Sequence, residues 1–326
     1  MSTVSPRRSR DVSDLVSRAR EGDPRAVARL VTLVESGDPL LPEIAAALAP
    51  YAGQAQVIGL TGSPGVGKST TTNELVRVLR ARGARVGVLA VDPSSPFTGG
   101  AILGDRVRMQ DHATDSGVYI RSMSSRGHLG GLSAATPAAV RVLEGAGCDV
   151  VVVETVGVGQ AEVDVASLAD TCLVLLAPGM GDAIQAVKAG ILEIADVFVV
   201  NKADRDGADA TYRDIQGMIA LGEREPGQWR PQVVRAVASR SEGIDGIVEA
   251  VDKHRAWLAG SGALTLRRRR RAQVEIEAIV VGRLRARIGS VGDGAELTAL
   301  SADVVEGRTD PYAAAERLLA RIAADR

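Results

Sequence analysis

The chain has 326 residues, of which 45% are hydrophobic, and its charges nearly cancel to a net value of −1. This length suits one large domain, or one domain with appendages. The high apolar content excludes a disordered chain. The balanced charge provides neither a basic field for nucleic acid nor an acidic tail, so we expect no nucleic-acid partner.

Cysteines and apolar runs bear on the compartment. The two cysteines, Cys148 and Cys172, are too few for a disulfide framework or a multi-cysteine zinc module, and both adjoin apolar runs, which favours buried thiols. The first residues carry charge without the apolar segment of a secretory signal. No run reaches the roughly 18 apolar residues that a membrane span needs. We therefore expect a cytoplasmic protein with no membrane partner.

Lysine and asparagine are rare in this chain. Only four of the 39 basic residues are lysine, at positions 68, 188, 202 and 253, and the two asparagines are Asn73 and Asn201. A codon bias towards arginine accounts for the general composition. The remaining lysines and asparagines are therefore candidates for sites that require those particular side chains.

Residues 11–50 show helical periodicity. Apolar residues recur at spacings of three and four from Leu15 to Val34. Gly-Asp-Pro at 22–24 and again at 37–39 separates the segments, with aspartate suited to a cap and proline to a first turn. Three helices are predicted, the last over residues 42–48.

Residues 55–260 alternate between short apolar runs and helical patterns. Strands are predicted at 57–60, 86–91, 150–153, 172–176 and 197–200, with weaker candidates at 118–120 and 232–234. Helices are predicted at 68–82, 136–146, 183–195, 208–222 and 244–259. Strands without polar alternation, separated by helices, indicate a parallel α/β sheet covered on both faces.

Residues 261–326 are predicted to be helical, with no further strand. Five arginines at 267–271 are interpreted as a solvated helix face. They precede an apolar stripe formed by Val274, Ile276, Ile279, Val280 and Leu284. The stripe indicates packing on the core or self-association.

Residues 62–69, Gly-Ser-Pro-Gly-Val-Gly-Lys-Ser, fit the pattern GxxxxGK[ST] between a predicted strand and a predicted helix. In this context the glycines let backbone N–H groups surround phosphate oxygens. Lys68 would contact the β- and γ-phosphates, and Ser69 would ligate Mg²⁺. The phosphate-binding residues expected here are Gly62, Gly65, Val66, Gly67, Lys68, Ser69 and Thr70.

The tetrapeptide Asn201-Lys202-Ala203-Asp204 follows the predicted strand 197–200 and resembles the NKxD motif of GTPases. The Asp204 carboxylate can accept both the N1–H and the N2–H of guanine, whereas adenine would leave it unpaired. Lys202 can lie along the base, and Asn201 can tie the strand end to the phosphate loop. A backbone N–H at Ala238 or Ser239, after the next candidate strand, would reach the guanine oxygen.

Two acidic residues follow strands predicted to lie beside the phosphate loop, Asp92 after 86–91 and Glu154 after 150–153. Open α/β sheets bind ligands at this edge, and either carboxylate can hold Mg²⁺ directly or through water. Glu154 stands where DxxG sequences have aspartate, and its greater length favours a contact through water. Gly157 would offer its N–H to the γ-phosphate.

Two loops are candidates for nucleotide-dependent switches. Asp105, in the polar loop after Asp92, can position the attacking water or the metal, or can cap a helix. The loop 177–188 carries two glycines, a proline and the rare Lys188. Asp182 or Lys188 would touch the nucleotide or a protein partner in one state only; a place on a helix surface is the alternative for Lys188.

Together these motifs resemble those of SIMIBI-class GTPases, and more narrowly those of the methylmalonyl-CoA mutase-associated GTPases, the MeaB/ArgK family. Beyond the two nucleotide motifs, the matching stretches are 92–95, 104–109, 121–123, 126–131, 154–160 and 178–188. The stretches 126–131 and 178–188 are the most specific to the family. The resemblance covers nearly the whole chain.

The resemblance implies a P-loop NTPase domain over 55–260, with a parallel sheet flanked by helices. A helical N-terminal segment would occupy 1–54, and a helical arm over 261–326 would form a homodimer. It implies a GTP-hydrolysing chaperone, with GTP or GDP and Mg²⁺ as ligands. Its partner would be an adenosylcobalamin-dependent acyl-CoA mutase, most simply methylmalonyl-CoA mutase. The chaperone would gate cofactor loading and protect or reactivate the mutase.

From the motifs and the resemblance we expect two sets of functional residues. Catalytic roles are expected for Lys68, Asp105, Glu154, Asp182 and Lys188. The candidate metal ligands are Ser69, Asp92, Asp105 and Glu154.

The motifs leave three other functions to consider. A P-loop kinase or phosphotransferase would need an acceptor site, for which no second motif stands out. A metallochaperone GTPase would need a ligand cluster, whereas the three histidines are scattered and the cysteines form no CxxC. A nucleotide-sensing scaffold would require very slow hydrolysis.

Overall fold

The computed structural model describes residues 11–92, 111–112, 114–124, 135–155, 160–179, 192–222, 225, 227–290 and 295–324. The chain divides into two compact units, residues 1–268 and 269–326.

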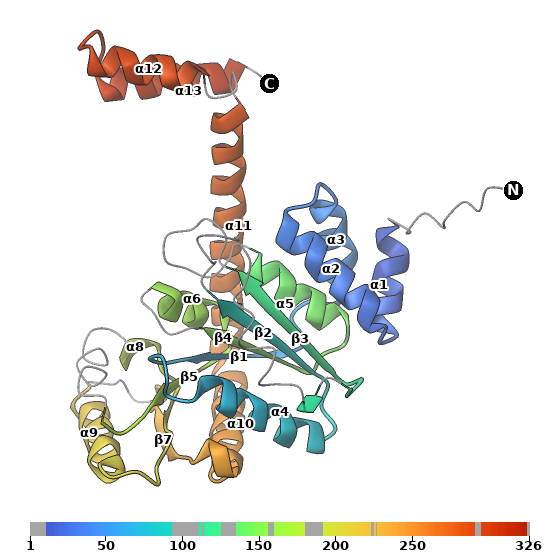
Figure 1. The fold of residues 1–326 in the computed structure, drawn as a ribbon, viewed down its shortest axis with the longest axis vertical. Helices are drawn as coiled ribbons and strands as arrows, with labels where there is room; N and C mark the ends of the chain where they lie inside the picture. The colour runs from blue at the N-terminus through green and yellow to red at the C-terminus, as the bar shows by residue number, and fades with distance from the viewer. Residues whose placement is uncertain are drawn as a thin grey trace, which may run out of the picture. The chain divides into compact units, whose positions relative to one another are not determined.

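The first unit is built on a parallel sheet whose seven described strands run in the order β3-β2-β4-β1-β5-β6-β7 (Figure 1). The strands are β1 (Gln56–Thr61), β2 (Val86–Asp92), β3 (Val118–Ser124), β4 (Val150–Thr155), β5 (Thr171–Leu176), β6 (Val197–Val200) and β7 (Gln232–Arg235). All the predicted strands are confirmed, including the two weaker candidates. Every residue of β1, β4, β5 and β6 is buried, which explains their unbroken apolar runs.

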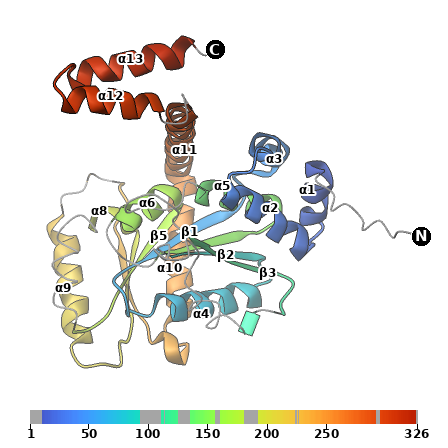
Figure 2. The ribbon, with the colours of Figure 1, turned by 45° about the horizontal axis from the view of Figure 1, so that its top comes forward.

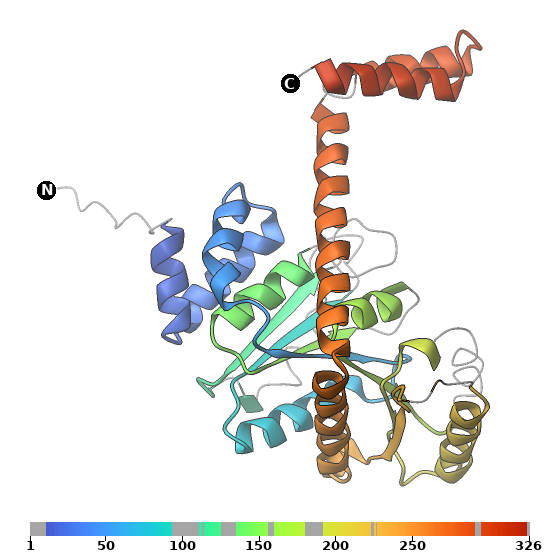
Figure 3. The same ribbon diagram turned by 180° about the vertical axis from the view of Figure 1, so that it is seen from behind.

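Helices cover both faces of the sheet. On one face α4 (Lys68–Ala81) and α10 (Ile244–Ser261) lie side by side (Figure 3). The opposite face carries α5 (Thr136–Gly145), α6 (Gln160–Leu168) and α9 (Ala208–Leu221). Figure 2 shows α5 and α6 above the sheet and α4 below it. This is the predicted P-loop NTPase architecture.

Two helices of the first unit do not match the predicted set fully. Helix α6 was not predicted. Of the helix predicted over 183–195, the structure describes only the last part, as α8 (Leu192–Ile194). Both cysteines are buried, as predicted.

Three helices precede the sheet, as predicted: α1 (Val12–Arg20), α2 (Pro24–Ser36) and α3 (Leu41–Leu48), with a short 3-10 turn at Ala49–Tyr51. Asp11 and Asp23 cap α1 and α2 by accepting backbone N–H groups, and Gly37 ends α2 in the left-handed region. Helix α2 packs on α5, and its Glu35 is paired with Arg121 of β3. The N-terminal segment is thus part of the first unit's core.

The amino edge of the sheet carries two buried aspartates that bind arginines. Arg267 donates to both carboxylate oxygens of Asp196, at 2.8 and 2.6 Å. Arg268 donates to both oxygens of Asp170, at 3.2 and 2.9 Å, and to the carbonyl oxygen of Ala55 at 3.0 Å. For these two arginines the predicted solvated face is wrong, because they lie in the second turn of helix α11 (Ala263–Ser290), directly beside the carboxylates that precede β5 and β6.

His254 of α10 belongs to the same edge and is fully buried. Its Nδ1 lies 2.9 Å from the Thr171 hydroxyl, and its Nε2 lies 3.3 Å from Asp196 Oδ1. Burial lowers the pKa of His254 to about 4, and the nearby charge of Arg267 adds to this, although Asp196 and Asp170 oppose it. His254 is therefore neutral in the folded protein at neutral pH.

We expect acid to destabilise the protein through His254. The pKa of His254 is about 4 in the folded protein, below the ordinary value of 6.5 that applies to the unfolded chain, so the unfolded chain takes up the proton first. The contribution of His254 to the free energy of unfolding is present in full well above pH 6.5 and is lost as the pH falls towards 4. At pH 5 the loss is about 2 kcal/mol. Urea denaturation at pH 7 and pH 5 measures the loss. His254→Gln should flatten this part of the pH profile; a slope as steep as that of the unaltered chain would contradict the assignment.

The second unit contains the remainder of α11, together with α12 (Ala295–Val305) and α13 (Pro311–Ala324). Helices α12 and α13 pack through Leu300, Ala314 and Leu318. On α11 the predicted apolar stripe is exposed: Val274, Ile276, Ile279, Val280 and Leu284 each expose between 47% and 62% of their surface. Among the described residues, no helix is both long and apolar enough to cross a membrane.

Candidate nucleotide-binding site

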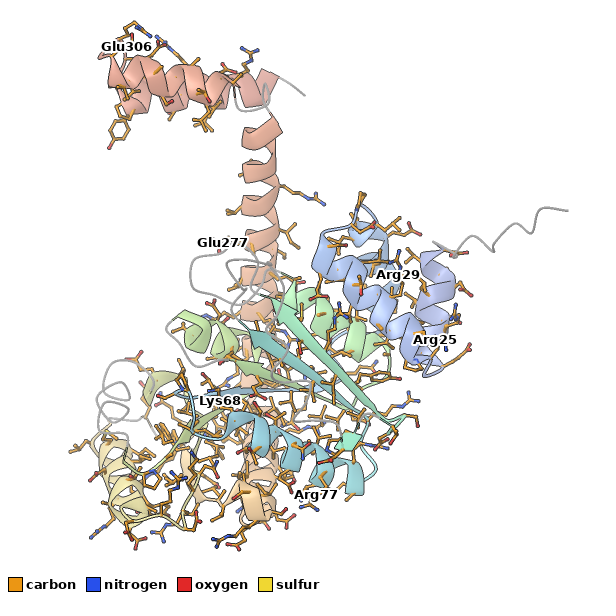
Figure 4. The ribbon with its side chains drawn as sticks, viewed as in Figure 1. Arg25, Arg29, Lys68, Arg77, Glu277 and Glu306 are labelled. Atoms are coloured by element: carbon orange, nitrogen blue, oxygen red, sulfur yellow. The ribbon has the colours of Figure 1, made fainter. Side chains whose placement is uncertain are left out.

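The predicted phosphate loop lies at the carboxyl edge of the sheet, between β1 and α4. Strand β1 is flanked by β4 and β5, so the chain leaves it in one direction and later crosses to the other side. Such a switch point is where open α/β sheets bind ligands. Figure 4 shows Lys68 at this edge, at the start of α4.

Two glycines shape the loop. Gly62 has φ +139°, and a Cβ there would lie 2.2 Å from the carbonyl oxygen of Leu175. Gly67 has φ +98°, and a Cβ there would lie 2.4 Å from the amide nitrogen of Asn201. Gly67 is the N-cap of α4, and as a glycine it has no side chain to accept a hydrogen bond from the first turn of the helix. A loop of this form suits a phosphate.

Lys68 is folded back over the loop and is 7% exposed. Its Nζ donates to the carbonyl oxygens of Gly62 and Ser63, at 2.7 and 3.1 Å. The ammonium group is therefore held above the same loop whose N–H groups would surround the phosphates. An arginine at this position would have a bulkier, planar guanidinium group, which could not replace the compact ammonium group in these contacts.

Glu154 projects from the end of β4 and is only 4% exposed. Its Oε1 accepts a hydrogen bond from the Ser69 hydroxyl at 2.6 Å, and its Oε2 accepts one from the Thr72 hydroxyl at 2.8 Å. Ser69 and Glu154, two of the predicted metal ligands, are thus in direct contact. Thr72 was not among the predicted site residues, although its place three residues after Ser69 puts it on the same face of the predicted helix.

Asn201 joins the two nucleotide motifs. Its side-chain nitrogen donates to the carbonyl oxygen of Val66 at 2.8 Å, and its side-chain oxygen accepts from the N–H of Ala238 at 3.0 Å. Asn201 is 2% exposed, so these bonds are shielded from water. The phosphate loop, the end of β6 and the turn after β7 are therefore held together by one side chain.

The other two polar residues of the motif lie nearer the surface. Lys202 has φ +56°, an uncommon value for a residue other than glycine, and its Nζ donates to the carbonyl oxygen of Gly65 at 2.6 Å. Asp204 forms an ion pair with Arg240 at 3.1 Å and remains 32% exposed. Lys202 and Asp204 therefore lie between the phosphate loop and the turn Ala238–Arg240.

The structure describes the remaining predicted residues unequally. Ser239 and Thr70 lie on the exposed surface, beside Ala238 and in the first turn of α4 respectively. Asp92 ends β2, but its side chain lies outside the described part. Asp105, Gly157, Asp182 and Lys188 also lie outside the described residues, so their predicted roles stay predictions.

Comparison with known proteins decides the family. The sequence profile of the family described as "Methylmalonyl Co-A mutase-associated GTPase MeaB" matches residues 27–292. The chain belongs to this family. It is therefore a GTPase, and the phosphate loop together with the family implies guanine-nucleotide binding. The family's name associates it with methylmalonyl-CoA mutase.

Individual relatives agree with the MeaB assignment. A Pyrococcus abyssi protein named as a GTPase is 47% identical over 314 residues, which cover 95% of this chain and 97% of that protein. The mouse methylmalonic aciduria type A homolog, mitochondrial, is 35% identical over 288 residues, covering 83% of this chain and 69% of its own. The crystal structure of a LAO/AO transport system kinase is 27% identical with a TM-score of 0.72, covering 98% of this chain and 100% of that one.

Proposed function

We propose that this MeaB-family GTPase is a chaperone for an adenosylcobalamin-dependent acyl-CoA mutase, most simply methylmalonyl-CoA mutase. GTP hydrolysis would gate loading of the mutase cofactor and protect or reactivate the mutase. The observation that carries the proposal is the family match over residues 27–292. The name of the mouse relative refers to methylmalonic aciduria, which is consistent with a partner that acts on methylmalonyl-CoA.

We place the nucleotide across the two motifs that Asn201 joins. The phosphates would lie in the loop Gly62–Gly67 and at the first turn of α4, with Lys68 turning its ammonium group from the loop carbonyls to the phosphate oxygens. Asp204 would accept the two guanine N–H groups. Because the Ala238 N–H already donates to Asn201, Ser239 is the better candidate to donate to the guanine oxygen.

We propose Mg²⁺ at Ser69 and Glu154. A hydroxyl and a carboxylate are oxygen donors of the type Mg²⁺ prefers, and Mg²⁺ sites commonly use few protein ligands together with phosphates. The two groups meet at 2.6 Å at the carboxyl edge of the sheet, so this donor set fits the ion. When bound, Mg²⁺ would neutralise charge on the phosphate oxygens. Asp92 and Asp105 are the proposed further ligands.

The remaining predicted residues complete the proposal. Gly157 would donate its N–H to the γ-phosphate. Asp105 would position the attacking water, and Asp182 and Lys188 would report the nucleotide state to the partner.

We propose that the apolar stripe on α11 pairs with the same stripe of a second copy. The five large apolar side chains of this stripe are exposed, which is unusual for a surface in water. This pairing would make the protein a homodimer. We further propose that it acts in the cytoplasm and has no nucleic-acid partner.

The partner is tested by capture of purified acyl-CoA mutases on the immobilised full chain, with GDP, with a non-hydrolysable GTP analogue and without nucleotide. We expect a complex with methylmalonyl-CoA mutase whose yield depends on the nucleotide. Lys68→Ala serves as the matched control, because loss of the ammonium group should remove the nucleotide dependence. If no mutase forms a nucleotide-dependent complex with the unaltered chain, the chaperone proposal is wrong.

A further inference from the structure

Two hydroxyl groups, not one, hold the Glu154 carboxylate. Ser69 donates to Oε1 at 2.6 Å, and Thr72 donates to Oε2 at 2.8 Å. All three side chains are buried, with Glu154 at 4%, Ser69 at 7% and Thr72 at 0% exposure. Both oxygens of a carboxylate that ends a central strand are therefore fixed by the helix that follows the phosphate loop.

The spacing explains how one carboxylate reaches both hydroxyls. Ser69 and Thr72 are three residues apart on α4, so their side chains lie on one face of the helix. Glu154 has one more carbon–carbon bond than aspartate, a reach of about 1.5 Å. The glutamate that replaces the usual aspartate of DxxG thus places its carboxylate between two hydroxyls of α4.

We propose that Thr72 is a positioning residue for the magnesium site. Its hydroxyl holds Oε2 of Glu154, which keeps Oε1 directed at the Ser69 hydroxyl. Because the Ser69 hydroxyl directs its hydrogen at Glu154, its oxygen would face the ion as an acceptor. This inference rests on the proposed binding of Mg²⁺ by Ser69 and Glu154. In this arrangement Thr72 would act on the ion only through Glu154.

The adjacent threonine provides an internal comparison. Thr71 is also 0% exposed, but its hydroxyl donates to the carbonyl oxygen of Gly67, within the start of its own helix, at 2.9 Å. Removing the Thr71 hydroxyl takes one hydrogen bond from the same turn of α4 without touching Glu154. The two positions therefore separate damage to the helix from loss of the hold on the carboxylate.

The test measures fluorescent GDP binding to the full chain with Mg²⁺ and with EDTA, alongside steady-state GTP hydrolysis. Thr72→Val removes the hydroxyl and keeps the shape. We expect the tightening of GDP binding by Mg²⁺ to fall by about 10- to 100-fold, the range for groups that orient metal ligands. Affinity in EDTA and KM should stay within about twofold while kcat falls. Thr72→Ser should restore the Mg²⁺ effect, and Thr71→Val should leave it intact.

The outcomes separate the role of Thr72 from the proposed binding of Mg²⁺ by Ser69 and Glu154. If Mg²⁺ does not change GDP affinity in the unaltered protein, the proposed magnesium site is wrong. If Mg²⁺ acts there and acts equally in Thr72→Val, or if Thr71→Val loses as much, the role of Thr72 is wrong. Should Thr72→Val fail to fold, Thr72→Ala against Thr72→Ser makes the same comparison, and equal Mg²⁺ effects in that pair overturn the role.

Discussion

The Asp204→Asn variant should lose its preference for guanine and bind xanthine nucleotides instead. The carboxylate of Asp204 would accept both the N1–H and the N2–H of guanine, whereas the amide of asparagine can accept only one of them and donates to the second position. Hydrogen bonds to a charged group contribute about 1.5 to 3 kcal/mol each, so GTP affinity should fall by about 100-fold or more. Xanthine carries a carbonyl at that second position, which suits the amide.

Competition between fluorescent GDP and unlabelled GTP, XTP and ATP measures this change. Asp206→Asn is the matched control, because Asp206 is exposed two residues along the same loop and should keep the guanine preference. Arg240→Ala tests the ion pair that Asp204 forms at 3.1 Å. Such a half-exposed pair contributes little, so we expect no more than about a fivefold change. GTP binding by Asp204→Asn as tight as in the unaltered chain would remove Asp204 from the base site.

The Arg268→Ala variant should lose about 3 to 5 kcal/mol of unfolding free energy, because the buried carboxylate of Asp170 loses the arginine that pairs with it. Asp170 exposes only 4% of its side chain, and Arg268 bonds both of its oxygens. The N–H of Val57 also donates to Asp170, at 3.0 Å, but it carries no compensating charge. The loss should be large for a single substitution.

Chemical denaturation of the full chain measures the loss. Arg269→Ala, in the same run of arginines, is the matched control; that side chain is exposed, and its removal should change stability by about 0.5 kcal/mol or less. A double variant, Arg268→Ala with Asp170→Asn, should recover part of the loss because the stranded charge is gone. Equal stability of Arg268→Ala and Arg269→Ala would contradict a structural role for the pair.

The strand pattern and the nucleotide motifs were predictable because each depends only on residues that are adjacent in the sequence. An unbroken apolar run such as 197–200 marks a strand buried on both faces, and all four of its residues are indeed buried. The phosphate loop and the Asn201 motif are likewise local, since glycine conformation and chemical type are properties of neighbouring residues. The rarity of lysine and asparagine pointed to Lys68, Asn201 and Lys202, and the structure brings these three side chains to one loop.

Contacts between distant residues could be decided only by the tertiary structure. Thr72 and Glu154 are 82 residues apart, and Arg268 and Asp170 are 98 residues apart. Residue type alone makes Thr72 an ordinary helix residue and Arg268 a solvated charge. Burial decides otherwise, because a carboxylate removed from water must find donors wherever the fold places them. The sequence by itself therefore identified the nucleotide-binding motifs, because they are local. Only the tertiary structure showed that Thr72 bonds Glu154 and that Arg268 pairs with Asp170.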